Sequence, residues 1–93
     1  MHVEASPIPG DNAPPRYPFV AWRRGIEGRV VIHLDIDAVG RVTAGCVEKS
    51  SGSALLDDAA LQQLLTWKFT PARGSLGPVA THHRQEVVFR LRG

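Results

Sequence analysis

Three side chains near the middle of this 93-residue chain have the types and spacing that acid–base chemistry requires. His33, Asp35 and Asp37 recur at every second residue, so on an extended strand they share one face. Two carboxylates placed in this way can act as an acid–base pair. Asp37, however, suits a turn over residues 37–40, and His33 and Asp35 can pair with side chains of a neighbouring strand. We therefore predict no catalytic residues here.

The adjacent histidines His82 and His83 suggest a metal site. Consecutive residues of a strand point to opposite faces, so the two rings cannot easily bind one ion together. We predict neither a metal site nor a cofactor. Cys46 is the one cysteine, which excludes an internal disulfide. It falls on the same predicted strand face as Val42 and Ala44, so we expect it to be a small buried residue.

Other polar groups have structural interpretations. The serine-rich run 50–53 lacks the strand and Gly-x-Ser-x-Gly context of a hydrolase nucleophile, so we interpret it as a helix entry with capping hydroxyls. Arg90 and Arg92 suit either anion binding or protection of a strand edge from aggregation, and we favour protection. The net charge is only +2 and the arginines are dispersed, so we expect no nucleic acid as a partner. We also expect no small-molecule substrate.

Alternating apolar residues predict three strands. The clearest strand covers residues 29–37, a second runs from residue 41 to about residue 49, and a last one covers about 79–91. A turn over residues 37–40 joins the first two into a hairpin. The residues predicted to face the core are Val30, Ile32, Leu34 and Ile36 in the first strand and Val87, Phe89 and Leu91 in the last.

Helical periodicity predicts two helices, over residues 19–24 and from residue 54 to about residue 66. Phe19, Val20 and Trp22 supply apolar contacts in the first helix. The apolar stripe of the second helix is Leu56, Ala60, Leu64 and Trp67. The predicted fold is therefore α+β, a three-stranded antiparallel sheet with two helices packed on one face. Residues 73–78 read as a surface loop.

The first fifteen residues hold four of the seven prolines, Pro7, Pro9, Pro14 and Pro15. Proline restricts φ and lacks a donor, so we expect residues 1–15 to be an extended or disordered linker remnant without packing, and residues 16–93 to be the folded domain. The sequence has no run of about 18 apolar residues that could span a membrane, and no signal peptide is visible.

A spaced pattern over most of the chain, roughly residues 14–91, resembles the C-terminal domain of TonB-type energy transducers from the Gram-negative periplasm. The residues that carry it are Tyr17-Pro18, Gly25-Ile26-Glu27-Gly28-Arg29-Val30, Asp37-Ala38-Val39-Gly40-Arg41-Val42, Ser50-Ser51-Gly52, Leu56-Asp57-Asp58-Ala59-Ala60 and Trp67-Lys68-Phe69-Thr70-Pro71-Ala72. Domains of this family often begin with the motif Gln-Pro-x-Tyr-Pro. Here Pro14 occupies the glutamine position, so a polar contact from that glutamine is absent.

The resemblance implies a non-enzymatic periplasmic domain whose last strand captures the N-terminal box peptide of a TonB-dependent outer-membrane transporter. Energy for uptake of siderophore- or cobalamin-type nutrients would come from an inner-membrane ExbB–ExbD-type complex. An anchor and spacer upstream of this sequence would contact that complex. The implied binding residues are Arg16, Tyr17, His82, His83, Arg84, Gln85, Glu86, Val87, Val88, Phe89, Arg90 and Leu91.

Strand addition follows from an open edge, because the edge strands of a sheet carry unpaired backbone groups that another chain can pair with. Such an edge also permits a homodimer. The alternative is a TonB- or TolA-like interaction module of an envelope assembly, secretion or sensor protein that transmits no force. A small hydrolase would need a clustered nucleophile and base, which the sequence does not supply.

Overall fold

The computed structural model describes residues 5–8, 10 and 12–91, so Pro9 and Arg92 of the predictions above lie outside the described residues. The elements are β1 (Ser6–Pro7), α1 (Phe19–Arg23), β2 (Gly28–Ile36), β3 (Val42–Lys49), α2 (Ala54–Leu64), β4 (Phe69–Thr70), β5 (Ala72–Gly74), β6 (Gly77–Val79) and β7 (Thr81–Phe89). In the part of the chain so described, no helix is long and apolar enough to cross a membrane.

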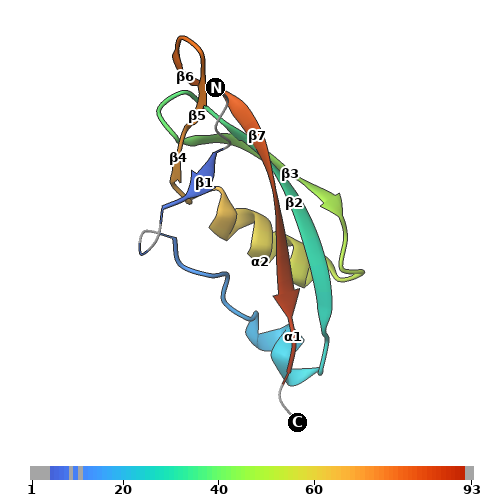
Figure 1. Cartoon of the computed structure of the whole chain (residues 1–93). Helices are drawn as coiled ribbons and strands as arrows, with labels where there is room; N and C mark the ends of the chain where they lie inside the picture. The colour runs from blue at the N-terminus through green and yellow to red at the C-terminus, as the bar shows by residue number, and fades with distance from the viewer. Residues whose placement is uncertain (1–4, 9, 11, 92–93) are drawn as a thin grey trace.

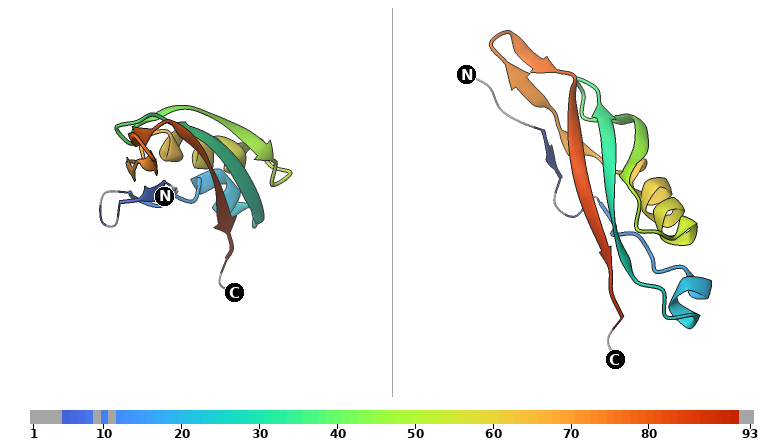
Figure 2. Two further views of the ribbon diagram at one scale, coloured as in Figure 1. Left: turned by 45° about the horizontal axis from the view of Figure 1, so that its top comes forward. Right: turned by 90° about the vertical axis from the view of Figure 1, so that its right-hand side faces the viewer.

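The three long strands form one antiparallel sheet in the order β3-β2-β7. Both helices lie on the same side of this sheet, with α2 under β2 and β3 and α1 near one end (Figures 1 and 2). The predicted α+β fold is confirmed. β2 is the central strand, so β3 and β7 are the two edges of this sheet.

The core lies between the sheet and α2. All four predicted core residues of β2 are buried, and the stripe of α2 meets them through Leu56, Ala60 and Leu64. Val87 and Phe89 of β7 complete this core, as predicted, together with Phe69. Burial of these apolar side chains is the main term that holds the helix on the sheet.

Asp37 closes the β2–β3 turn, as predicted. Its Oδ1 accepts hydrogen bonds from the backbone N–H groups of Val39 (3.0 Å) and Arg41 (2.9 Å). Gly40 has a φ of +90°, and a Cβ added there would lie 1.8 Å from the carbonyl oxygen of Phe69. Only glycine therefore fits this turn.

Cys46 is exposed, and the prediction that it is buried was wrong. The cause is an irregularity in the β2–β3 register: Ile36 pairs with Val42, but Asp35 pairs with Ala44, so one residue of β3 is skipped. A bulge of this kind reverses the alternation of faces after it. Gly45 instead faces α2, where it lets the helix approach β3 closely.

The apolar side chains of α1 were predicted to be packing contacts, and this was also wrong. Phe19, Val20 and Trp22 are 65%, 45% and 57% exposed, and Ala21 is the buried residue of this helix. The helix is only five residues long, so one residue on one face suffices to attach it to the core. Phe19 and Trp22 stack on each other at its surface.

Residues 73–78 are not a plain loop. β5 and β6 pair as a short antiparallel hairpin, with Arg73 opposite Pro78 and Gly74 opposite Gly77. Three-residue strands have too few alternating positions to give a periodic signal, and the Gly- and Pro-rich composition conceals them.

The described part of the proline-rich amino-terminal segment is extended where it pairs, but it contacts the rest of the domain, contrary to the prediction of a segment without packing. Ser6 and Pro7 of β1 pair with Thr70 and Phe69 of β4. The side chain of Asn12 donates to the carbonyl of Lys68 (2.8 Å) and accepts from its N–H (2.7 Å). Prolines lack a backbone donor but keep a carbonyl acceptor. Composition does not show that a segment has hydrogen-bond partners more than fifty residues away in the sequence.

The serine run does lead into α2, but the helix cap differs from the prediction. The Ser53 side chain makes no capping hydrogen bond. Instead, Asp57 in the first turn reaches back, and its carboxylate accepts from the hydroxyls of Ser50 and Ser51 and from the N–H of Ser51. Partial burial raises the pKa of Asp57, but these hydrogen bonds outweigh it, so the pKa lies below its ordinary value.

Candidate functional site: the open edge of β7

The outer edge of β7 carries backbone groups that no other strand of the described residues pairs with. Within residues 5–8, 10 and 12–91, β2 is the only strand that pairs with β7. The N–H of Leu91 points to the β2 side, where it donates to Glu27 (3.0 Å), whereas the carbonyl of Glu86 accepts from the Gln85 side chain (3.1 Å). The direction of the backbone N–H and C=O groups alternates along an antiparallel strand. Those of the even-numbered residues of β7, Val88 among them, therefore point to the open edge.

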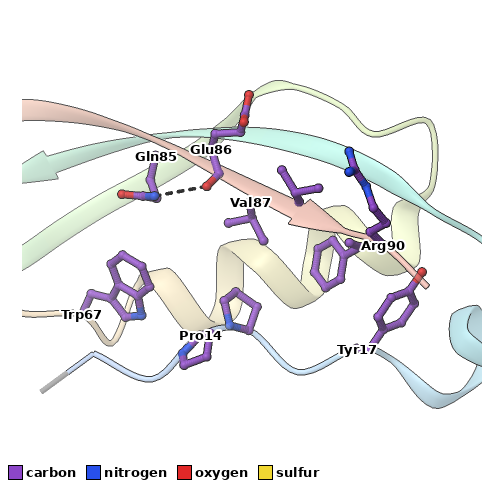
Figure 3. A pocket seen from close by; sticks show the side chains of 10 residues that line it. Pro14, Tyr17, Trp67, Gln85, Glu86, Val87 and Arg90 are labelled. Carbon is purple, nitrogen blue, oxygen red and sulfur yellow. Dashed lines mark hydrogen bonds between the residues drawn. The ribbon is translucent and has the colours of Figure 1, made fainter. Parts of the chain in front are cut away.

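A groove of about 380 Å³ follows this edge (Figure 3). One side is β7, and the opposite side is the amino-terminal segment that carries Pro14 and Tyr17 (Figure 3). Its lining residues are Pro14, Pro15, Tyr17, Trp67, Gln85, Glu86, Val87, Val88, Phe89 and Arg90. The inward side chains of β7 at Val87 and Phe89 are buried and give the groove an apolar floor, while Glu86 and Arg90 lie exposed at its rim.

The wall opposite β7 is held at both ends. Near its start, the indole Nε1–H of Trp67 donates to the carbonyl of Ala13 (2.8 Å). At its end, the Tyr17 hydroxyl donates to the carbonyl of Ile26, and its ring packs edge-on against Phe89 with centroids 5.3 Å apart. Desolvation, and secondly the charge of Glu27, raise the pKa of Tyr17, so the hydroxyl remains a donor. The groove is therefore preformed.

The predicted binding residues divide into three sets. Tyr17 and residues 85–90 line the groove, so the structure brings most of them together. Arg16 is exposed beside it, and Leu91 lies just beyond β7. Residues 82–84 do not line the groove. They border a separate hollow of about 600 Å³ that also includes His33 and Glu48.

Sequence reasoning missed Pro14, Pro15 and Trp67. The prolines were assigned to a linker, and Trp67 was assigned to the apolar stripe of the second helix. The structure places Trp67 after α2, half-buried, with its ring facing the groove (Figure 3). A buried tryptophan normally needs a partner for its N–H, and this requirement was the available signal for a nearby acceptor.

The acid–base interpretation of Asp35 gains no support. Nδ1 of His82 lies 2.7 Å from Oδ1 of Asp35, and Nε2 of His33 lies 3.2 Å from the same oxygen. The His82 hydrogen bond lowers the pKa of Asp35, desolvation opposes it, and the His33 hydrogen bond lowers it further. A carboxylate with a depressed pKa is a weak general base and is not protonated to act as an acid at neutral pH.

Comparison with known proteins shows which family this fold belongs to. The family model for the Gram-negative bacterial TonB protein C-terminal region matches residues 13–91. The chain belongs to the TonB C-terminal domain family. Members of this family are transducer and interaction modules rather than enzymes, in agreement with the prediction of a non-enzymatic domain.

Two TonB proteins illustrate the similarity. The chain is 41% identical over 78 residues to protein TonB of Xanthomonas campestris pv. campestris strain B100, covering 84% of this chain and 35% of that protein. It is 39% identical over 79 residues to protein TonB of Vibrio cholerae, covering 85% of this chain and 32% of that protein. The chain thus spans about a third of the length of these relatives.

Solved TonB C-terminal domains have the same fold. The solution structure of the Pseudomonas aeruginosa domain superimposes with a TM-score of 0.77 at 33% identity, covering 97% of this chain and 89% of that one. The Helicobacter pylori domain gives a TM-score of 0.64 at 32% identity, covering 84% and 70%. These matches do not favour the alternative of an assembly or sensor module.

Proposed function

We propose that this TonB C-terminal domain binds an extended peptide by strand addition along the outer edge of β7. The open edge is the observation that carries the proposal: the backbone groups of Glu86 and Val88 face away from β2, beside a preformed groove. A peptide strand there makes main-chain hydrogen bonds, and its alternate side chains meet different surfaces.

The two faces of β7 give such a peptide different environments. On the helix side, a peptide side chain enters the groove between β7 and Pro14, Pro15 and Trp67, where the floor is apolar. On the other side, it lies beside the charged pair Arg29–Glu86, whose side chains are 3.6 Å apart and about half exposed. We therefore expect an alternating peptide, apolar on one side and polar on the other.

The partner we propose is the N-terminal box of a TonB-dependent outer-membrane transporter for siderophore- or cobalamin-type nutrients. The support is membership of a family whose matched relatives are named TonB. In this proposal the domain lies in the periplasm, as part of an inner-membrane-anchored protein that an ExbB–ExbD-type complex energises. A strand pulled along its length loads several hydrogen bonds at once, which suits the transmission of force.

The direct test is a chemical-shift titration of the labelled domain with a synthetic transporter-box peptide. We expect micromolar-range binding, because the interface is small. The amides of residues 82–91 and the indole of Trp67 should shift most. A matched control peptide carries N-methyl groups on alternate backbone amides, which preserves every side chain but removes donors. Two such peptides are made, one for each set of alternate amides, and the peptide whose methylated amides would bond to β7 should bind weakly.

Two results would contradict strand addition at β7. The first is a set of shifts confined to the face of residues 33–37 or to β3. The second is equal affinity for the parent peptide and for both methylated registers. An open edge also lets two copies pair, so sedimentation should accompany the titration, and the peptide should compete with any homodimer that forms.

A further inference from the structure

Three potential metal ligands converge on the face of the sheet that α1 and α2 leave uncovered. They are Nε2 of His33, Oδ1 of Asp35 and Nδ1 of His82, which lie within 4.8 Å of one another. The three separations are 3.2 Å between His33 and Asp35, 3.2 Å between His33 and His82, and 2.7 Å between His82 and Asp35. From this geometry we propose a binding site for a divalent transition metal ion of the Zn²⁺ type.

The strand register produces this convergence. His33 and Asp35 are two residues apart on β2 and share its uncovered face, and His82 is the direct cross-strand partner of Asp35 on β7. Side chains at directly opposed positions of an antiparallel pair are close neighbours. The intervening Leu34 and the following Ile36 are buried in the core, so the backbone that carries two of the ligands is firmly held.

The distances fit a tetrahedral ion. With zinc bonds of about 2.0–2.1 Å, two ligand atoms of a tetrahedral site lie about 3.3 Å apart. Two of the three observed separations already match this value, and the third, between His82 and Asp35, must open by roughly half an ångström. Such a change is small for the His82 side chain, which is 71% exposed.

Glu48 on β3 lies near His33 and could supply a second feature found in metal sites, although the present separation is longer than a hydrogen bond. When a histidine binds an ion through one ring nitrogen, its other nitrogen commonly donates to a carboxylate, which fixes the tautomer. Nδ1 of His33, the nitrogen away from the proposed ion, lies 3.9 Å from Oε1 of Glu48. Glu48 also pairs with Arg84, so the arginine beside the cluster has its charge compensated.

Two imidazoles and one carboxylate suit zinc and its transition-metal neighbours, whereas Mg²⁺ and Ca²⁺ prefer sites made of oxygen atoms. Three protein ligands leave one coordination position facing solvent. The site therefore resembles an open rather than a closed zinc site and can accept a fourth ligand from water or from another molecule. It lies outside the proposed peptide groove, which none of the three residues lines.

The test titrates ZnCl₂ alone into the purified domain, with calorimetry for stoichiometry and long-range ¹H–¹⁵N spectra of the histidine rings. We expect one ion per chain, bound through Nε2 of His33 and Nδ1 of His82. His82→Gln and His33→Gln should each weaken binding by more than about tenfold, because even outer ligands contribute about that much. MgCl₂ at the same concentration should leave the histidine spectra unchanged.

His83→Gln is the matched control, because it removes the adjacent histidine of β7 whose side chain faces the opposite side of the sheet. It should retain the affinity for zinc. Backbone amide spectra verify that each variant is folded, and His82→Gln alters an exposed side chain that the core does not need. The proposal is overturned if zinc produces no binding heat, if His82→Gln binds as tightly as the parent, or if the ring signals that respond do not belong to His33 and His82.

Discussion

Val88→Pro tests whether the edge of β7 binds a peptide strand. Proline removes the backbone N–H, which at this position faces the open edge and not β2, so no hydrogen bond of the sheet is lost. Proline also restricts the preceding residue to extended conformations, and Val87 already lies within a strand. The Val88 side chain is 45% exposed. We therefore expect the variant to fold and to lack one donor.

The size of the effect follows from one backbone hydrogen bond. Such a bond contributes about 0.5–1.5 kcal/mol net, which corresponds to a roughly 2–12-fold loss of affinity. The proline ring at the edge adds a steric cost, so this range is a lower bound for the loss. The comparison is made with Val88→Ala, which removes most of the side chain but retains the N–H, and should change the affinity much less.

The assay is calorimetric or fluorescence-anisotropy binding of the transporter-box peptide at fixed salt concentration, with amide spectra to verify folding. If both variants are folded and Val88→Pro binds as tightly as Val88→Ala, the N–H of residue 88 makes no bond to the peptide. The peptide would then use another surface, for which the other edge strand, β3, is the first candidate.

Three further predictions concern stability and the groove. Gly40→Ala should lower the free energy of unfolding, measured in urea, by more than Gly52→Ala. Both have positive φ, which costs roughly 1–3 kcal/mol, but a Cβ meets a backbone oxygen only at residue 40, so equal losses would contradict this reasoning. Asp57→Asn should be less stable than the parent at pH 7. Because the pKa of Asp57 is depressed in the folded state, its charged carboxylate stabilises the fold above the unfolded-state pKa, and this stabilisation is lost as pH falls, so the difference in the free energy of unfolding should narrow below about pH 4. A difference independent of pH would exclude this origin. Trp67→Phe removes the hydrogen bond to Ala13 and should speed amide exchange in residues 13–17 while weakening peptide binding, whereas unchanged exchange would show that the indole does not hold this wall.

The regular elements were largely predictable because their signals are local. The alternation of Val30, Ile32, Leu34 and Ile36 predicted both β2 and its buried face, and the stripe of Leu56, Ala60 and Leu64 predicted α2. Failures occurred where local pattern and tertiary packing diverge. A skipped residue in β3 exposed Cys46, and α1 proved too short to bury its aromatic residues.

The candidate site was predictable in part. The resemblance pointed to the last strand, and residues 85–90 do line the groove. The opposite wall was not predictable, because its position depends on bonds such as that from Trp67 to Ala13, which are 54 residues apart. No periodicity or composition records a contact at that separation.

By itself, the sequence determined the α+β class, the strand over residues 29–37 with its buried face, the turn at Asp37 and the family, because each depends on residue type and short-range spacing. Only the tertiary structure decided which strands lie at the edges, what forms the wall beside β7, and that His82 lies opposite Asp35. These features depend on strand order and register. Both are set when distant segments bury their apolar faces together, and a shift of one residue would place every side chain of a strand on the other face.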